Sequence, residues 1–272
     1  MENLTLKLIL TPLLVGTASL AGRRWGPAVS GWLVALPLTS GPIVFFLSLS
    51  HGVRFAAVVA VATLVGAISQ AAFCLIYSWL ALRWRWPRAL IASCLAFVAA
   101  TTLFQYLLLP LLLQFLLVVL ILVLTLHFMP HAAAPLTARL STPPLWDLPT
   151  RIVVTTLFVL LLTGSAPALG AHLTGLLAPF PLYGAILAVF TQHQDGPMPA
   201  IRVLRGLLFG LFSFAGFFLV LAVLLGQVPI AWAFGAASAV ALTSQAGTLW
   251  ALGWRTRAPS IVHRLSSRLH IT

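Results

Sequence analysis

The sequence predicts an all-α polytopic membrane protein with about nine transmembrane helices in two inverted-topology repeats, of five and four helices, each with a proline-broken second helix. Three observations predict this fold: the composition, an internal duplication and the distribution of arginines. Of the 272 residues, 61% are hydrophobic and 7% are charged, and the mean hydropathy is +1.09. This composition lies far outside the range of soluble domains and is typical of chains with several membrane spans.

The duplication is an ungapped match between two stretches that lie 144 positions apart. The stretch GPAVSGWLVALPLTSGPIVFFLSLSHG begins at Gly26, and its counterpart GAHLTGLLAPFPLYGAILAVFTQHQDG begins at Gly170. Leucine and alanine match often in an apolar chain, so the weight rests on the shared glycines and proline, which mark backbone geometry. These matched pairs are Gly26 and Gly170, Gly31 and Gly175, Pro37 and Pro181, Gly52 and Gly196, and Gly66 and Gly210.

Apolar runs of about 20 residues are long enough to cross a membrane. In the first repeat, residues 1–129, we expect spans at 4–21, 29–49, 55–82, 89–107 and 109–129, with a tight turn at 105–110 between the last two. A Pro-rich cytoplasmic linker follows at 130–150. In the second repeat, residues 151–254, we expect spans at 152–165, 173–191, 203–225 and 231–252.

The basic residues predict the orientation, because Lys and Arg accumulate in short cytoplasmic loops. With the N-terminus outside and the C-terminus inside, only Lys7 and Arg54 of the 15 basic residues are external. The tail at 255–272 is basic and amphipathic, which favours contact with the anionic inner leaflet of the bilayer; binding to a partner protein is the alternative. We therefore expect a multi-pass protein of a bacterial inner membrane.

An odd number of spans before the second copy makes the two copies enter the membrane from opposite sides. Arg23 and Arg24 precede the first broken span, whereas residues 167–172, before the second, carry no Lys, Arg, Asp or Glu. This asymmetry agrees with one loop inside and one outside. Inverted repeats are the architecture of many secondary transporters, in which one scaffold opens to either side.

Each copy places a proline in the middle of its second span, where it removes a backbone hydrogen bond and breaks the helix. After Pro37, a new helix can begin with Thr39 or Ser40 as its cap and Gly41 in its first turn. After Pro181, a new helix is expected near Tyr183 or Gly184. Two such helix N-termini at membrane depth would suit an anion. The alternative is a pair of ordinary proline kinks with packing glycines.

Polar residues at membrane depth are further candidates for a binding site. Thr101 and Thr102 match Thr243 and Ser244 at a separation of 142 and are interpreted as symmetry mates lining one cavity, although hydrogen bonding between helices is the simpler role for each. The candidate substrate-binding residues are Pro37, Thr39, Ser40, Gly41, Pro181, Tyr183, Gly184, Thr101, Thr243 and Ser244. Other polar groups at depth include Ser69, Gln70, Ser213 and Gln245.

Two helices carry stripes of small residues that predict close helix packing. The first stripe is Ala62, Gly66 and Gln70, and the second is Gly206, Gly210 and Phe214.

Several other functions are not favoured by the sequence. The three acids, Glu2, Asp147 and Asp195, all fall in expected loops, which disfavours proton relays or sodium sites built on carboxylates; sodium bound by carbonyls and hydroxyls remains an alternative. The histidines lack metal-ligand spacing, and no cofactor or catalytic motif occurs. The arginines are scattered between apolar runs, which disfavours a nucleic-acid partner.

The overall plan resembles that of bacterial inverted-repeat carriers of the bile-acid or sodium–proton antiporter kind, with one span fewer in the second copy. The resemblance covers architecture alone, and the absence of intramembrane acids departs from it. With the paired helix N-termini, we expect a non-enzymatic carrier that moves a small or amphipathic, anionic substrate by alternating access, with its site between the two broken spans. The alternative is a non-transporting membrane subunit, or an assembly or regulatory protein.

Overall fold

The computed structural model describes residues 8–9, 12–13, 37, 39–107, 109–130 and 147–247. Most of the expected span at 4–21, the first half of the broken span at 29–49, most of the linker and the tail lie outside the described residues. The described helices are α3 (Ser40–Ser50), α4 (Val53–Ala81), α5 (Trp86–Phe104), α6 (Leu111–Phe128), α7 (Asp147–Leu177), α8 (Leu182–Asp195) and α9 (Pro197–Leu224). Residues 230–247 form a further helix, and the described part of the chain contains no strand.

Among the described residues, the helix boundaries agree with the expected spans in the first repeat and differ in the second, where α7 begins at Asp147, within the expected linker. The turn expected at 105–110 is confirmed, because α5 ends at Phe104 and α6 begins at Leu111. In contrast, the expected spans at 152–165 and 173–191 are not separated by a loop. Helix α7 continues through this region and changes direction at Gly170, whose φ of 73° is readily adopted by glycine.

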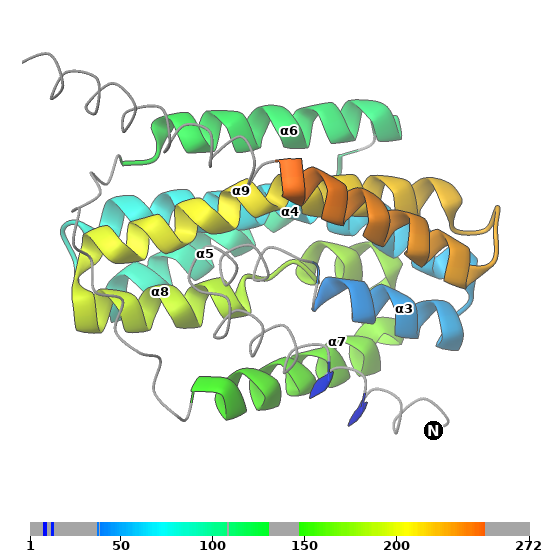
Figure 1. The fold of residues 1–272 in the computed structure, drawn as a ribbon, viewed down its shortest axis with the longest axis horizontal. Coiled ribbons are helices and arrows are strands. Elements are labelled where there is room, and N and C mark those ends of the chain that lie inside the picture. Colours follow the sequence, from blue (N-terminus) through cyan, green and yellow to red (C-terminus); the bar gives the residue numbers. More distant parts are fainter. Residues whose placement is uncertain are drawn as a thin grey trace, which may run out of the picture.

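Helices α4 and α9 form the centre of the molecule and pack against each other (Figure 1). Helices α5 and α7 pack on α4, α8 packs on α9, and α6 contacts both central helices. The outer helices present large apolar side chains to the surroundings, among them Leu95 on α5, Leu112 on α6 and Leu161 on α7. Five described helices are long and apolar enough to cross a membrane, which indicates a membrane-embedded protein; the count of nine spans stays a prediction.

Two helix starts recur in the second half of the chain at the separation of 144 found in the sequence. Helix α4 begins at Val53 and α9 begins at Pro197, 144 positions later. The preceding glycines, Gly52 and Gly196, have φ values of 85° and 88°. The helix that follows each central helix begins at Trp86 and at residue 230, again 144 positions apart.

The equivalent helices run in opposite directions. In Figure 1 the turn between α3 and α4 lies at one end of the molecule, and the turn between α8 and α9 lies at the other end. Helices α3 and α8 both begin near the middle and run outward to these opposite ends (Figure 1). The shared boundaries and opposed directions are the observations on which an inverted repeat can be proposed.

Candidate functional site: two helix breaks in contact

The first break lies immediately before α3. Thr39 occupies the cap position of this helix, but its side chain makes no capping hydrogen bond. The backbone is satisfied locally, because the Gly41 N–H donates to the Pro37 carbonyl at 2.8 Å and the Ile43 N–H donates to the Thr39 carbonyl at 3.2 Å. The buried Ser40 hydroxyl is therefore free to reach outside its own helix.

The second break separates α7 from α8. Helix α7 ends at Leu177, and α8 begins at Leu182 with Pro181 in the cap position, one residue before the expected restart at Tyr183 or Gly184. Within the break, the Phe180 N–H donates to the Leu177 carbonyl at 3.0 Å, and the Leu182 N–H donates to the Phe180 carbonyl at 2.8 Å. The helical hydrogen bond that Leu182 would give to the carbonyl of Ala178 is thereby lost.

A hydrogen bond joins the two breaks. The Ser40 hydroxyl donates to the carbonyl of Ala178 at 2.8 Å, and the contact is buried. Backbone groups freed inside a membrane protein need another partner, because lipid supplies none. Ser40 supplies that partner to the second break, so the two breaks are in contact at this point.

Helix α4 lies against the second break through two glycines. A Cβ atom on Gly66 would lie 2.6 Å from Cγ of Pro179 and 2.8 Å from the carbonyl oxygen of Leu176. A Cβ atom on Gly175 would lie 2.4 Å from the carbonyl oxygen of Val59 and 2.5 Å from Cβ of Ala62. Only glycine allows this approach of backbones, so the predicted packing role is confirmed for Gly66. Gly206 differs, because a Cβ atom there would meet no heavy atom within 4 Å.

The remaining residues of the candidate site at the breaks are also closely surrounded. A Cβ atom on the buried Gly184 would lie 2.5 Å from Cδ2 of Leu207. A Cβ atom on Gly41 would lie 3.8 Å from the ring of Phe217. Pro181 is buried, whereas the side chain of Tyr183 lies outside the described part of the structure.

Aromatic side chains surround Phe180, which lies within the second break. Its ring centroid lies 6.4 Å from that of Phe73 on α4, 5.2 Å from that of Phe97 on α5 and 6.3 Å from that of Phe158 on α7. The second break therefore combines freed backbone groups with an apolar, aromatic wall drawn from three helices.

Two polar pairs connect each central helix to the helix that follows it. The Thr101 hydroxyl donates to the Ser69 hydroxyl at 3.0 Å, and the Ser213 hydroxyl donates to Oε1 of Gln245. Positions 69 and 213, and positions 101 and 245, are 144 apart, so these two bonds are equivalent in the two repeats.

Thr101 and the pair Thr243 and Ser244 are not brought together in the way that the sequence interpretation expects. Both Thr243 and Ser244 are exposed, and each hydroxyl donates to a carbonyl of its own helix, at 2.9 Å to Ala239 and at 2.6 Å to Val240. The residue equivalent to Thr101 is Gln245. Keeping the separation of 144, instead of the local match at 142, would have identified Gln245 from the sequence.

A third polar connection links α8 to the end of α4. The Tyr77 hydroxyl donates to Oε1 of Gln192 at 2.8 Å, and Nε2 of Gln192 donates to the carbonyl of Trp84 at 2.9 Å. Gln192 therefore satisfies a carbonyl beyond the last turn of α4. It has no counterpart in the other repeat, where position 48 is a serine that donates to its own helix.

The breaks contain no described charged side chain. Neither α3 nor α8 has an acidic residue in its first turn, and neither is capped by a side chain. The positive ends of both helix dipoles are thus uncompensated by the described residues. Comparisons of the chain with known protein families, with curated proteins and with solved structures give no match.

Proposed function

We propose that this protein is a secondary transporter of a bacterial inner membrane, which moves a small or amphipathic anionic substrate by alternating access between two inverted repeats. The observation that carries the proposal is the contact between the two breaks, where the Ser40 hydroxyl meets the Ala178 carbonyl. Broken helices that meet at mid-membrane form the binding sites of many inverted-repeat transporters.

The inverted repeat is supported by equivalent boundaries and by equivalent bonds. Each half contains a short helix that begins at a break, a positive-φ glycine, a long central helix and a following helix that is bonded to the central one by a buried polar pair. The two long helices run in opposite directions (Figure 1). Two halves related in this way can exchange conformations, which gives one state open to each side of the membrane.

The anionic substrate is supported by the electrostatics of the breaks. An uncapped helix N-terminus presents free N–H groups and about half a positive charge. Helices α3 and α8 both begin near the centre of the molecule, without a described acid to compensate them. Their positive ends are therefore directed towards the same region, which attracts an anion and repels a cation.

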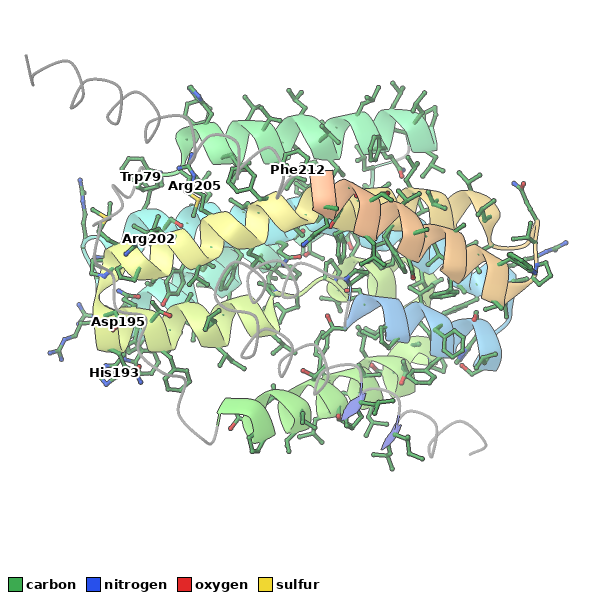
Figure 2. All side chains as sticks on the ribbon, viewed as in Figure 1. Trp79, His193, Asp195, Arg202, Arg205 and Phe212 are labelled. Carbon is green, nitrogen blue, oxygen red and sulfur yellow. The ribbon has the colours of Figure 1, made fainter. Side chains whose placement is uncertain are left out.

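The orientation follows from the charged residues at one end of the molecule. Figure 2 shows five labelled residues at the same end of the molecule: Trp79, His193, Asp195, Arg202 and Arg205. Gln192 bonds the Trp84 carbonyl, which places the loop that carries Arg83 and Arg85 at this end as well. We propose that this end faces the cytoplasm, with the N-terminus outside, and that the basic tail contacts the anionic inner leaflet.

The second candidate is a non-transporting membrane subunit or an assembly or regulatory protein. It is favoured by the packing at the second break, where Pro179 lies directly against Gly66 and Val59 against Gly175. In this conformation, the contacting backbones leave no room for a substrate at these two points. A transporter must separate them during its cycle, whereas a subunit can keep them together.

Thermal unfolding of the purified protein in detergent, against a library of organic anions, lipid precursors and sodium or potassium salts, tests the proposal. A ligand at a hundred times its dissociation constant adds about 2.7 kcal/mol of stability. We expect an anion to stabilise the protein and to be accumulated by proteoliposomes that contain it. A library without effect, together with a protein that co-purifies at a fixed ratio, would favour the subunit.

A further inference from the structure

Gln70 is a buried polar residue in the middle of α4 that has no hydrogen-bond partner among the described residues. Its side chain is 6% exposed, and within the described part of the chain its amide makes no hydrogen bond. A buried amide that lacks partners costs free energy, so such a group in a native protein needs an explanation. The amide atoms of Gln70 keep a little exposure, since the fully buried side-chain atom without a partner among the described residues is Oε1 of Gln114 on α6, whose Nε2 donates to the carbonyl of Leu107.

The position of Gln70 on α4 directs its side chain towards the second break. Residues 66, 70, 73 and 77 follow one another at the i, i+4, i+7 and i+11 positions of a helix and therefore share one face. Gly66 contacts Pro179, the Phe73 ring packs against Phe180, and the Tyr77 hydroxyl bonds Gln192 on α8. Gln70 lies between two residues that each touch the break.

The second break, which the face of Gln70 borders, ends at the N-terminus of α8, a helix of 14 residues. The Leu182 N–H donates to Phe180, and the Ala185 N–H donates to Pro181. Helix geometry leaves the N–H groups of Tyr183 and Gly184 without an intrahelical acceptor, and no side chain caps them. The face of α4 that carries Gln70 and the first turn of α8 thus border the same break.

The position equivalent to Gln70 in the second repeat carries an apolar residue. The position 144 residues after Gln70 is Phe214, which is buried and packs its ring 4.6 Å from that of Phe218. The two central helices therefore present different chemistry at this pair of equivalent positions. Among the described residues, the buried glutamine without a hydrogen-bond partner on a central helix lies beside the second break.

The other residues that line the second break indicate the chemistry of the rest of the ligand. An aromatic wall lines the same break and is made of Phe180 and the three rings around it, Phe73, Phe97 and Phe158. None of the described residues that line the break carries a charge. A ligand with one negative charge is matched by the donors and the helix dipole, whereas a second charge of either sign would be left without a partner.

We propose that Gln70 and the first turn of α8 bind the carboxylate of a monoanion whose apolar body packs against the Phe180 cluster. This inference rests on the proposed function and names its substrate class as apolar monocarboxylates. Gln70 donates its N–H₂ group to one carboxylate oxygen, and the N–H groups of Tyr183 and Gly184 donate to the other. No proton transfer or covalent step is involved.

The test uses benzoate as the probe, with benzyl alcohol as the neutral analogue and phthalate as the doubly charged one. Binding to the purified full-length protein is measured by calorimetry, for the natural sequence, Gln70→Met and the matched control Phe214→Leu. We expect benzoate to bind more tightly than either analogue. Loss of hydrogen bonds to a charged group weakens binding about 10- to 100-fold, so we expect this loss in Gln70→Met and no such loss in Phe214→Leu.

A second readout excludes a merely structural role for Gln70. Methionine has a similar length and needs no hydrogen bond, so the ligand-free Gln70→Met protein is expected to unfold at a higher temperature than the natural protein. Higher stability combined with weaker benzoate binding supports a binding site. If Gln70→Met were instead less stable, Gln70→Asn, which keeps the amide but shortens its reach, would have to weaken binding for the proposal to hold.

The outcomes separate this inference from the proposed function. Equal benzoate binding by the natural protein and Gln70→Met, or equal binding of benzoate and benzyl alcohol, overturns the carboxylate site. Uptake of some other anion by proteoliposomes, unaffected by Gln70→Met, would overturn this site and leave the transporter intact. Benzoate binding that depends on Gln70, without uptake of benzoate or another monocarboxylate, would support the site and overturn transport.

Discussion

Gly175 allows α7 to pack closely against α4, because it carries a hydrogen atom where other residues carry a side chain. Its Cα lies so close to α4 that a Cβ atom would overlap the carbonyl oxygen of Val59 and Cβ of Ala62. Both neighbours belong to a helix that is buried along most of its length, so neither can move aside easily. The same reasoning applies to Gly66 and the carbonyl oxygen of Leu176.

We therefore expect Gly175→Ala to destabilise the protein by about 1–3 kcal/mol, the usual cost of overpacking a core. Gly164→Ala is the matched control, because Gly164 lies in the same helix, is exposed and would have no heavy atom within 4 Å of an added Cβ atom. That change is expected to leave stability unchanged or to raise it by up to about 1 kcal/mol. Thermal unfolding in detergent measures both. Equal effects of the two substitutions would contradict the close approach at Gly175.

At the scale of elements, the hydrogen bond between Ser40 and Ala178 connects the beginning of α3 with the end of α7. We expect Ser40→Ala to lower the free energy of unfolding by about 1–3 kcal/mol, because the freed Ala178 carbonyl then lacks a partner in a buried, apolar environment. Ser50→Ala is the control, since Ser50 is exposed and donates to the Phe46 carbonyl of its own helix. A loss as large for Ser50→Ala as for Ser40→Ala would argue against a special role for the contact between breaks.

The two prolines that precede α3 and α8 are expected to matter for movement more than for insertion. Replacing Pro37 and Pro181 by alanine removes the restriction on the backbone at each break and allows a continuous helix to form. Both segments stay apolar, so the double variant should reach the membrane at a normal level. Its substrate uptake in proteoliposomes should be strongly reduced. Normal uptake by the double variant would show that the breaks are not required for transport.

The sequence predicts the breaks better than it predicts the polar contacts between helices. Proline and glycine act on their own backbone, so Pro181 and Gly52 mark local geometry that can be read without knowledge of the fold. Gln245 is bonded by Ser213, which lies 32 residues away in the sequence, and nothing local distinguishes it from Gln70, which has no hydrogen-bond partner among the described residues. The prediction of a loop before residue 173 was wrong for a related reason, because Gly170 can change the direction of a helix within a single residue.

At the scale of the whole molecule, the helix directions and the basic residues lead to the same orientation. Trp79 donates to the Phe128 carbonyl at 3.1 Å, so α4 and α6 end at the same end of the molecule. This end also holds Arg202 and Arg205 (Figure 2). Arg54 follows the turn between α3 and α4, which lies at the opposite end (Figure 1). The positive-inside rule therefore supports the proposal that the end with Trp79 faces the cytoplasm.

Single cysteines in the turns test this orientation and the opposed directions of the repeats together. The background carries Cys74→Ala and Cys94→Ala, which remove the two natural cysteines. His51→Cys and Gln227→Cys lie in exposed turns at the end that we assign to the outside, and Arg85→Cys and Gln194→Cys lie at the cytoplasmic end. A membrane-impermeant maleimide should label the first two in intact cells and the other two only after permeabilisation.

The pattern of labelling distinguishes two separate errors. The reverse pattern would keep the fold and invert its orientation. It would mean that the arginines at the end with Trp79 do not set the topology. Labelling of positions 51 and 194 from the same side would contradict the opposed directions of the α3–α4 and α8–α9 hairpins. Alternating access between inverted repeats requires those directions, so that second result would remove the basis for a transporter and would leave the membrane subunit as the better explanation.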